Sequence, residues 1–193
     1  SIRLAPGGTA IISLDVDSYY YDYTCTYINT DTLQCATLGT DSGLICFISA
    51  SQDSKNEQVQ VYVPNEPASV LIDVIVDKNA PENHVLADDS TVPDFGAYTK
   101  TAPLNVYIEN GVVAFFYEAE SVAANGITDT SMLQGYFDAL EAAGFEYVGS
   151  NMFENTITYG FYNSTDNRAY TYAEVLNSDG YVVGFGTGFT CNF

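Results

Sequence analysis

The stretch LNVYIENGVVAFFYE, residues 104–118, carries the strongest local folding signal in the chain. Asn110-Gly111 lies between two runs of alternating apolar residues, 104–108 and 112–118, and this pattern is typical of a β-hairpin with a two-residue turn. The hairpin predicts that the second half of the chain contains an antiparallel sheet.

One helix is predicted near residues 130–143. Asp129-Thr130-Ser131 offers N-cap side chains, four apolar residues then recur at helical spacing, and Gly144 stands where a glycine commonly ends a helix. Strand-like segments follow it. We therefore expect residues 104–193 to form an α+β domain, with one helix packed on an antiparallel sheet. The later strand segments are 155–163, 168–176 and 181–191.

Residues 1–79 read as short strands separated by turns. The turn Pro6-Gly7-Gly8 leads into an apolar strand, and further segments follow at spacings of roughly 8–12 residues, which favours a β-sandwich. The expected strands are 9–17, 19–28, 33–38, 43–50, 59–63 and 69–76.

The run Pro6-Gly7-Gly8-Thr9-Ala10-Ile11-Ile12 resembles the opening of the bacterial Ig-like domains found in secreted and surface proteins. This resemblance implies an Ig-like β-sandwich over residues 1–79, and it brings no catalytic residues with it. The three cysteines in this half depart from the usual pattern, since those domains normally lack cysteine.

Residues 80–103 are polar and rich in Pro and Gly, so we expect a linker or surface loop there. Within it, Val92-Pro-Asp-Phe-Gly-Ala-Tyr98 resembles the entry to small α+β domains of secreted Gram-positive proteins. The predicted fold class is therefore mostly β with an α+β second half: an Ig-like β-sandwich, then an antiparallel sheet with one packed helix.

The charge is lopsided, with 25 acidic residues, 5 basic residues and a net charge of −20. Nucleic acid binding takes its affinity from Lys and Arg that neutralise phosphates, so five dispersed cations exclude that partner class. An anionic membrane surface is excluded for the same reason. Membrane insertion is not expected, because no apolar run reaches the roughly 20 residues that a membrane span needs.

The four cysteines predict a disulfide framework and an oxidising, extracellular compartment, because their number is even and none forms a Cys-x-x-Cys pair. Three connectivities stay open, and so does pairing of the last cysteine between molecules. Asn163 begins the sequence Asn-Ser-Thr, a glycosylation signal in an exposed loop if the route is eukaryotic. The cysteines are Cys25, Cys35, Cys46 and Cys191.

Acidic clusters make calcium the one cofactor considered, because carboxylate oxygens in loops are its usual ligands. The first cluster is Asp15, Asp17 and Asp22, and the second is Asp88, Asp89 and Asp94. Neither fits the EF-hand spacing, and no other cofactor is predicted.

No catalytic residue is predicted. His84 is the single histidine, lies in a polar stretch and is expected to be solvated, and there is no Gly-x-Ser-x-Gly sequence. Asp138 and Glu141 are placed together by helical spacing, on the solvated side of the predicted helix. Gly184, Gly186 and Gly188 share one strand face, and we expect an aromatic side chain or another backbone to pack there.

These features predict a secreted or cell-surface, disulfide-stabilised binding or adhesion module without catalytic activity. Its partner would be a protein or glycan at the cell exterior, or another copy of itself, and the sequence does not identify the binding residues. Two alternatives stay open. One is a structural subunit of an extracellular filament or surface layer assembled by strand pairing, with the apolar start at residues 1–4 as a donated strand. The other is a carboxylate-based glycan hydrolase.

Overall fold

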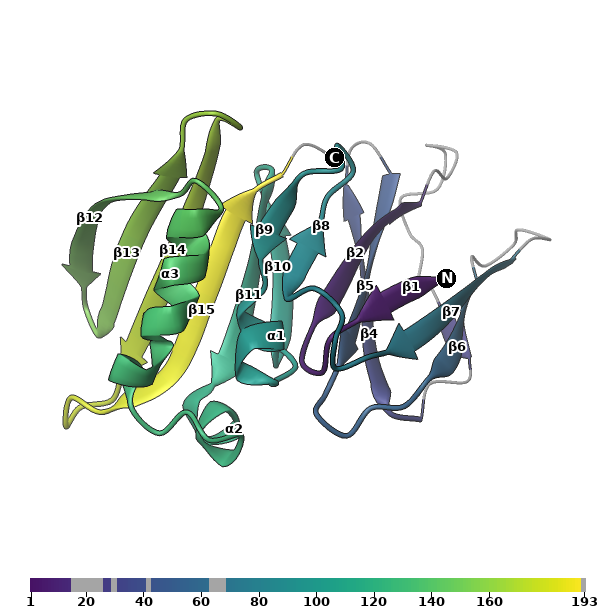
Figure 1. Cartoon of the computed structure of the whole chain (residues 1–193), viewed down its shortest axis with the longest axis horizontal. Coiled ribbons are helices and arrows are strands. Elements are labelled where there is room, and N and C mark those ends of the chain that lie inside the picture. The colour runs from purple at the N-terminus through teal and green to yellow at the C-terminus, as the bar shows by residue number, and fades with distance from the viewer. Residues whose placement is uncertain (15–25, 29–30, 41–42, 63–68, 192–193) are drawn as a thin grey trace.

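The computed structural model describes residues 1–14, 26–28, 31–40, 43–62 and 69–191. It is mostly β, with several antiparallel sheets and short helices (Figure 1). The expected fold class is confirmed at that level. The described helices include none that is both long and apolar enough to cross a membrane.

The first half of the chain forms two sheets. One has the strand order β1-β7-β6-β3 and the other β2-β5-β4, and all neighbours are antiparallel except β1 and β7. The apolar start of the chain therefore pairs within its own molecule. The strands are β1 (Ile2–Leu4), β2 (Thr9–Leu14), β3 (Thr26–Ile28), β4 (Leu33–Thr40), β5 (Gly43–Ala50), β6 (Glu57–Tyr62) and β7 (Ser69–Val76).

One hydrophobic cluster joins these two sheets. Alternate residues of β5, such as Cys46 and Ile48, pack with alternate residues of β6 and β7, such as Val59 and Val74. Every second residue of a strand faces the same side, so Cys46 and Ile48 enter this cluster, while Ile45 and Phe47 of the same strand enter a second core.

The second half forms a six-stranded antiparallel sheet in the order β10-β11-β15-β14-β13-β12. The hairpin predicted from Asn110-Gly111 is confirmed, and both turn residues have the positive φ (51° and 73°) that this tight turn requires. The strands are β10 (Asn105–Glu109), β11 (Val112–Glu118), β12 (Glu146–Phe153), β13 (Thr156–Asn163), β14 (Arg168–Leu176) and β15 (Val182–Thr190).

The helix predicted near 130–143 is present as the 3₁₀ turn η1 (Thr130–Leu133) and the helix α3 (Gln134–Ala142). Asp129 caps it by accepting a hydrogen bond from the backbone N–H of Ser131. Tyr136 and Leu140 are buried against the sheet, and Figure 1 shows α3 lying across one of its faces. A further short helix, α2 (Ala119–Ala124), was not predicted.

Residues 80–103 differ from the expected linker. They form the small sheet of β8 (Asn83–Val85) and β9 (Thr91–Pro93), followed by the helix α1 (Phe95–Thr99). Val92 and Phe95 are fully buried. They belong to a hydrophobic core that also contains Phe47 of β5 and Phe115 of β11. The segment therefore connects the two halves through a shared core, and it also buries polar residues, among them His84 and Asp94.

The predicted disulfide framework is wrong for the part of the chain that the structure describes, where no disulfide bond is present. Cys35 and Cys191 have free thiols, and burial raises the pKa of each to about 12. Cys46 is fully buried on the strand next to that of Cys35, while Cys25 lies outside the described residues. The cysteines consequently give no support to an oxidising compartment.

Candidate functional site

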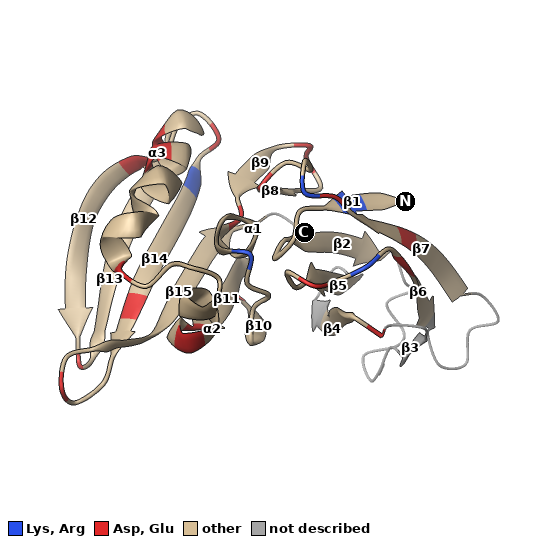
Figure 2. Cartoon of the chain, turned by 60° about the horizontal axis from the view of Figure 1, so that its bottom comes forward, with Lys and Arg blue, Asp and Glu red and all other residues tan. Residues whose placement is uncertain are grey.

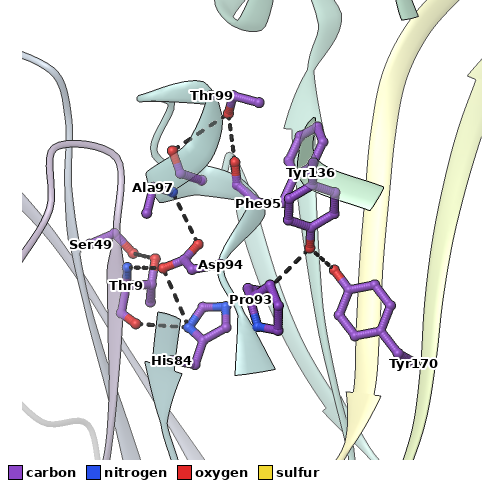
Figure 3. Close-up of polar contacts among 11 residues, drawn as sticks. Thr9, Ser49, His84, Pro93, Asp94, Phe95, Ala97, Thr99, Tyr136 and Tyr170 are labelled. Atoms are coloured by element: carbon purple, nitrogen blue, oxygen red, sulfur yellow. Dashed lines mark hydrogen bonds and ion pairs between the residues drawn. The ribbon is translucent and has the colours of Figure 1, made fainter. Parts of the chain in front are cut away.

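A buried polar cluster lies where the first half of the chain meets β8 and α1 (Figure 3). His84 and Asp94 are each 1% exposed. Nδ1 of His84 lies 3.5 Å from Oδ2 of Asp94 and 2.9 Å from the carbonyl oxygen of Thr9. The same Asp94 oxygen accepts a hydrogen bond from the backbone N–H of Thr9 at 2.8 Å, and the Thr9 hydroxyl lies 2.8 Å from that of Ser49.

The position of Thr9 on an edge strand explains this cluster. β2 is paired with β5 on one side only, and the backbone N–H and C=O of Thr9 are bonded to Asp94 and His84 instead of a second strand. Buried backbone groups need such partners. The carboxylate and the imidazole therefore replace a neighbouring strand at this point.

The cluster contains hydroxyl, imidazole and carboxylate groups, the types found in hydrolytic triads. In a triad the imidazole bridges the nucleophile and the acid, whereas His84 faces a carbonyl and a carboxylate, and the hydroxyls of Thr9 and Ser49 face each other. All four residues are buried. We interpret the cluster as a structural junction, and the expectation that His84 is solvated is wrong.

Two buried tyrosines adjoin this junction. The hydroxyl of Tyr136 donates a hydrogen bond to the carbonyl oxygen of Pro93 at 3.2 Å, and it also pairs with the hydroxyl of Tyr170 (Figure 3). Burial raises the pKa of both phenols. Both therefore stay neutral at physiological pH and anchor α3 to the sheet.

An open groove lies on the other side of α3, above β12 and β13. It consists of two adjoining hollows of about 440 and 450 Å³ that share Phe137, Tyr147 and Phe161. We call it the α3–β12 groove. The first hollow is also lined by Asp129, Thr130, Ser131, Tyr159 and Glu174, and the second by Gln134, Asp138, Glu141, Phe145 and Glu146.

The floor of the α3–β12 groove is aromatic. Phe161 stacks on Phe137 with ring centroids 6.2 Å apart, and Tyr147 meets Phe161 edge-on at 5.7 Å. Tyr147 remains 57% exposed, although it is held in place by this contact. The rings therefore offer a fixed and accessible apolar surface.

The rim of the groove is acidic. Five of its lining residues are carboxylates, and none is Lys or Arg; Figure 2 shows acidic segments on α3 and at one end of β12. Partial burial and the nearby Glu174 raise the pKa of Tyr159, so this phenol stays neutral. Hydrogen bonds from Ser131 lower the pKa of Asp129, which keeps that rim carboxylate ionised.

β12 forms the outer wall of the groove and the edge of the sheet. It exposes large apolar side chains, among them Val148, Met152 and Phe153. Edge strands are commonly protected by Lys, Pro or a bulge. β12 contains neither Lys nor Pro, and a single register shift between Tyr147 and Gly149 interrupts its pairing.

The acidic residues considered for calcium do not form a site in the described part of the chain. Asp15, Asp17 and Asp22 lie outside it. Asp94 belongs to the buried junction, and Asp88 accepts hydrogen bonds from Ser90 and Arg168. Among the residues that the structure describes, no group of three or more His, Cys, Asp or Glu is arranged to hold a metal ion.

Asn163 is 4% exposed, at the end of β13, which differs from the exposed loop expected for a glycosylation signal. Its Nδ2 donates to the carbonyl oxygen of Ala143 at 3.0 Å, and its Oδ1 accepts from the backbone N–H of Thr165. A glycan on Nδ2 would displace this contact. The side chain orders the turn between β13 and β14 instead.

The packing predicted for the glycine face is confirmed at Gly184. A Cβ atom there would lie 2.5 Å from Cζ of Phe116, so the aromatic ring occupies the space that a side chain would need. At Gly186 the nearest neighbour would be the Cβ of Ala173, at an ordinary 3.6 Å.

The groove was not predicted, because its outer wall β12 was not recognised as a strand. Gly149-Ser-Asn151 reads as a turn, and only the preceding Tyr147-Val148 hints at a strand. Asp138 and Glu141 were noted as a pair, but as part of a solvated surface. Neither protein-family models nor curated proteins give a match to this chain.

Proposed function

We propose that this protein is a non-catalytic binding module of the cell exterior, and that its α3–β12 groove holds a cationic segment of a partner protein. The observation that carries the proposal is the combination of an aromatic floor with a rim of five carboxylates. A location outside the cell stays a prediction, now without support from the cysteines.

The chemistry of Lys and Arg fits this combination. Their long stems pack on apolar surface while the charged heads stay in a polar setting, and a cation over an aromatic ring is attracted by its negative face. Exposed rings such as Tyr147 would hold the stem, and rim carboxylates such as Glu141 and Glu146 would face the charged head. The net charge of −20 would speed the encounter with a basic partner.

We also infer that residues 1–79 form an Ig-like β-sandwich that presents the binding domain. The strand order supports this inference. If β1 to β7 are lettered A to G, the two sheets read B-E-D and C-F-G, as in Ig domains. Strand A is displaced, since β1 pairs with β7.

A fluorescent Leu/Lys amphipathic peptide, with its Leu/Glu counterpart as the negative probe, tests the groove by anisotropy titration. We expect the Leu/Lys peptide to bind with micromolar affinity and the Leu/Glu peptide not to bind. Replacing Tyr147 by Ser should weaken binding by about tenfold, a loss of about 1.4 kcal/mol. Tyr107→Ser removes a similarly exposed tyrosine from β10 and should leave binding unchanged.

Charge needs its own control, because a strongly acidic protein attracts any cationic peptide. The double variant Glu141→Gln with Glu146→Gln removes two rim charges, and Glu109→Gln with Asp179→Asn removes two exposed charges elsewhere. We expect only the first pair to weaken binding clearly. Equal losses in both pairs would show non-specific attraction and reject the groove as the binding site.

A further inference from the structure

The sheet face that points away from α3, which we call the outer face, has mostly small side chains at its centre. The pairing registers place one row of residues across all six strands: Asn105, Phe116, Gly186, Ala173, Thr158 and Asn151. The next row reads Tyr107, Ala114, Gly188, Thr171, Gly160 and Gly149. Small side chains therefore occupy the middle of the face. Phe116 and Tyr107 stand near one end, and Val148, which lies against Gly160, and Tyr162 stand near the other.

No described helix packs on the outer face. The core residues of the central strands, such as Val113, Tyr172 and Phe185, all belong to the alternate set, which points toward α1 and α3. Thr171 on the outer face is exposed, and Ala173 and Thr158 on the same face are half-buried. Among the residues that the structure describes, nothing that we identify covers the centre of this face.

The two central rows carry no charge, although the chain has 25 acidic residues. The acidic residues of the outer face in the described part of the chain, Glu109 and Glu118, stand at strand ends along its margins. Two molecules of net charge −20 repel each other, and like charges brought together cost several kcal/mol. This face lets two copies meet without opposing carboxylates at the centre.

The size of the face is sufficient for a stable contact. Six strands about 4.8 Å apart, with about seven residues at about 3.3 Å each, span roughly 29 by 23 Å, or about 650 Å². Two copies in contact would bury about 1,300 Å² in total, above the roughly 1,000 Å² expected of a specific interface.

From charge and area together, we propose that two copies of this chain stack outer face to outer face around a two-fold axis. Two sheets pack face to face in this way in β-sandwiches. A two-fold interface uses the same surface of both copies. The half-buried ring of Phe116 and the exposed ring of Tyr107 of each copy would therefore contact the outer face of the other copy. The α3–β12 groove lies on the opposite face and stays open, so the dimer would present two grooves.

The full chain, analysed by light scattering after size exclusion at micromolar concentration, tests this proposal. We expect a mass of twice 20.9 kDa. Thr158→Glu places a carboxylate at the centre of the face, where burial without a partner is costly, and should produce a monomer. Ser178→Glu adds the same charge to the exposed loop between β14 and β15 and should remain dimeric.

Thr171→Glu gives a second disruption at an exposed position, in case the first variant does not fold by circular dichroism. A monomeric wild-type protein would overturn the proposal, and so would a Thr158→Glu or Thr171→Glu protein that folds and stays dimeric. Filaments on electron microscopy grids would overturn it too, because a two-fold interface closes after two copies. None of these outcomes bears on peptide binding in the groove.

Discussion

At the scale of single residues, burial controls the chemistry of the two free thiols. Burial raises the pKa of Cys35 and Cys191 to about 12. The thiolate is the reactive form, and the raised pKa makes it a very minor species at pH 8. Its population rises only as the pH approaches 12. These cysteines therefore behave as inert apolar groups in the folded protein.

We expect iodoacetamide at pH 8 to label Cys35 and Cys191 very slowly in the native protein and fully in urea. Peptide mapping by mass spectrometry reads out each site. Free cysteine added at the same concentration is the control for reagent activity. Rapid native labelling of either site would contradict the raised pKa of that thiol. A failure to label unreduced protein in urea would reveal a bond that the described part of the structure does not contain.

At the scale of elements, β15 gives a matched pair of glycines on one strand face. A methyl group at Gly184 would lie 2.5 Å from the ring of Phe116, and one at Gly186 would have an ordinary contact. We expect Gly184→Ala to lower the free energy of unfolding by about 1–2 kcal/mol, because overpacking displaces the ring. Gly186→Ala should stay within about 0.5 kcal/mol of wild type.

Urea unfolding followed by near-ultraviolet circular dichroism measures both glycine variants, since the chain has 16 tyrosines as probes. Equal losses of stability in the two variants would mean that flexibility of the strand, and not the space taken by Phe116, decides the cost. Such a result would remove the packing explanation of this glycine face.

Local patterns predicted those elements whose own residues decide their structure. The strand segments 43–50 and 69–76, the Asn110-Gly111 turn and the apolar face of α3 are all contained within a few residues, and all are confirmed. β12 was missed because Gly149-Ser-Asn151 has a turn-like composition, and pairing with β13 imposes the strand. Tertiary packing commonly overrides such weak propensities.

The errors in the site have the same origin. His84 lies in a polar sequence, yet it is buried because Thr9, 75 residues away, needs a partner for its carbonyl. The α3–β12 groove joins residues of α3, β12 and β13 that no local pattern brings together. The disulfide prediction rested on cysteine number and spacing, which say nothing about how far apart the folded strands hold the sulfur atoms.

At the scale of the whole molecule, the two halves share a core and should unfold together. Phe47 of β5 meets Phe115 of β11 with ring centroids 6.1 Å apart, and both belong to the cluster that contains Phe95. The junction beside them is tightly fitted: a Cβ atom at Gly96 would lie 2.4 Å from the carbonyl oxygen of Gly7. The segment 80–103 therefore holds the two halves together, because its residues pack against both of them.

Gly96→Ala tests this joint, because its methyl group would push the Gly7 loop away from α1. We expect a stability loss of up to about 3 kcal/mol, and hydrogen exchange should accelerate in β5 and β11 by the same factor, since both strands depend on the shared core. Gly186→Ala is the control, with exchange in both strands unchanged. If β5 alone lost protection while β11 kept it, the halves would be separate folding units, and the packing of Phe47 against Phe115 would contribute little to their stability.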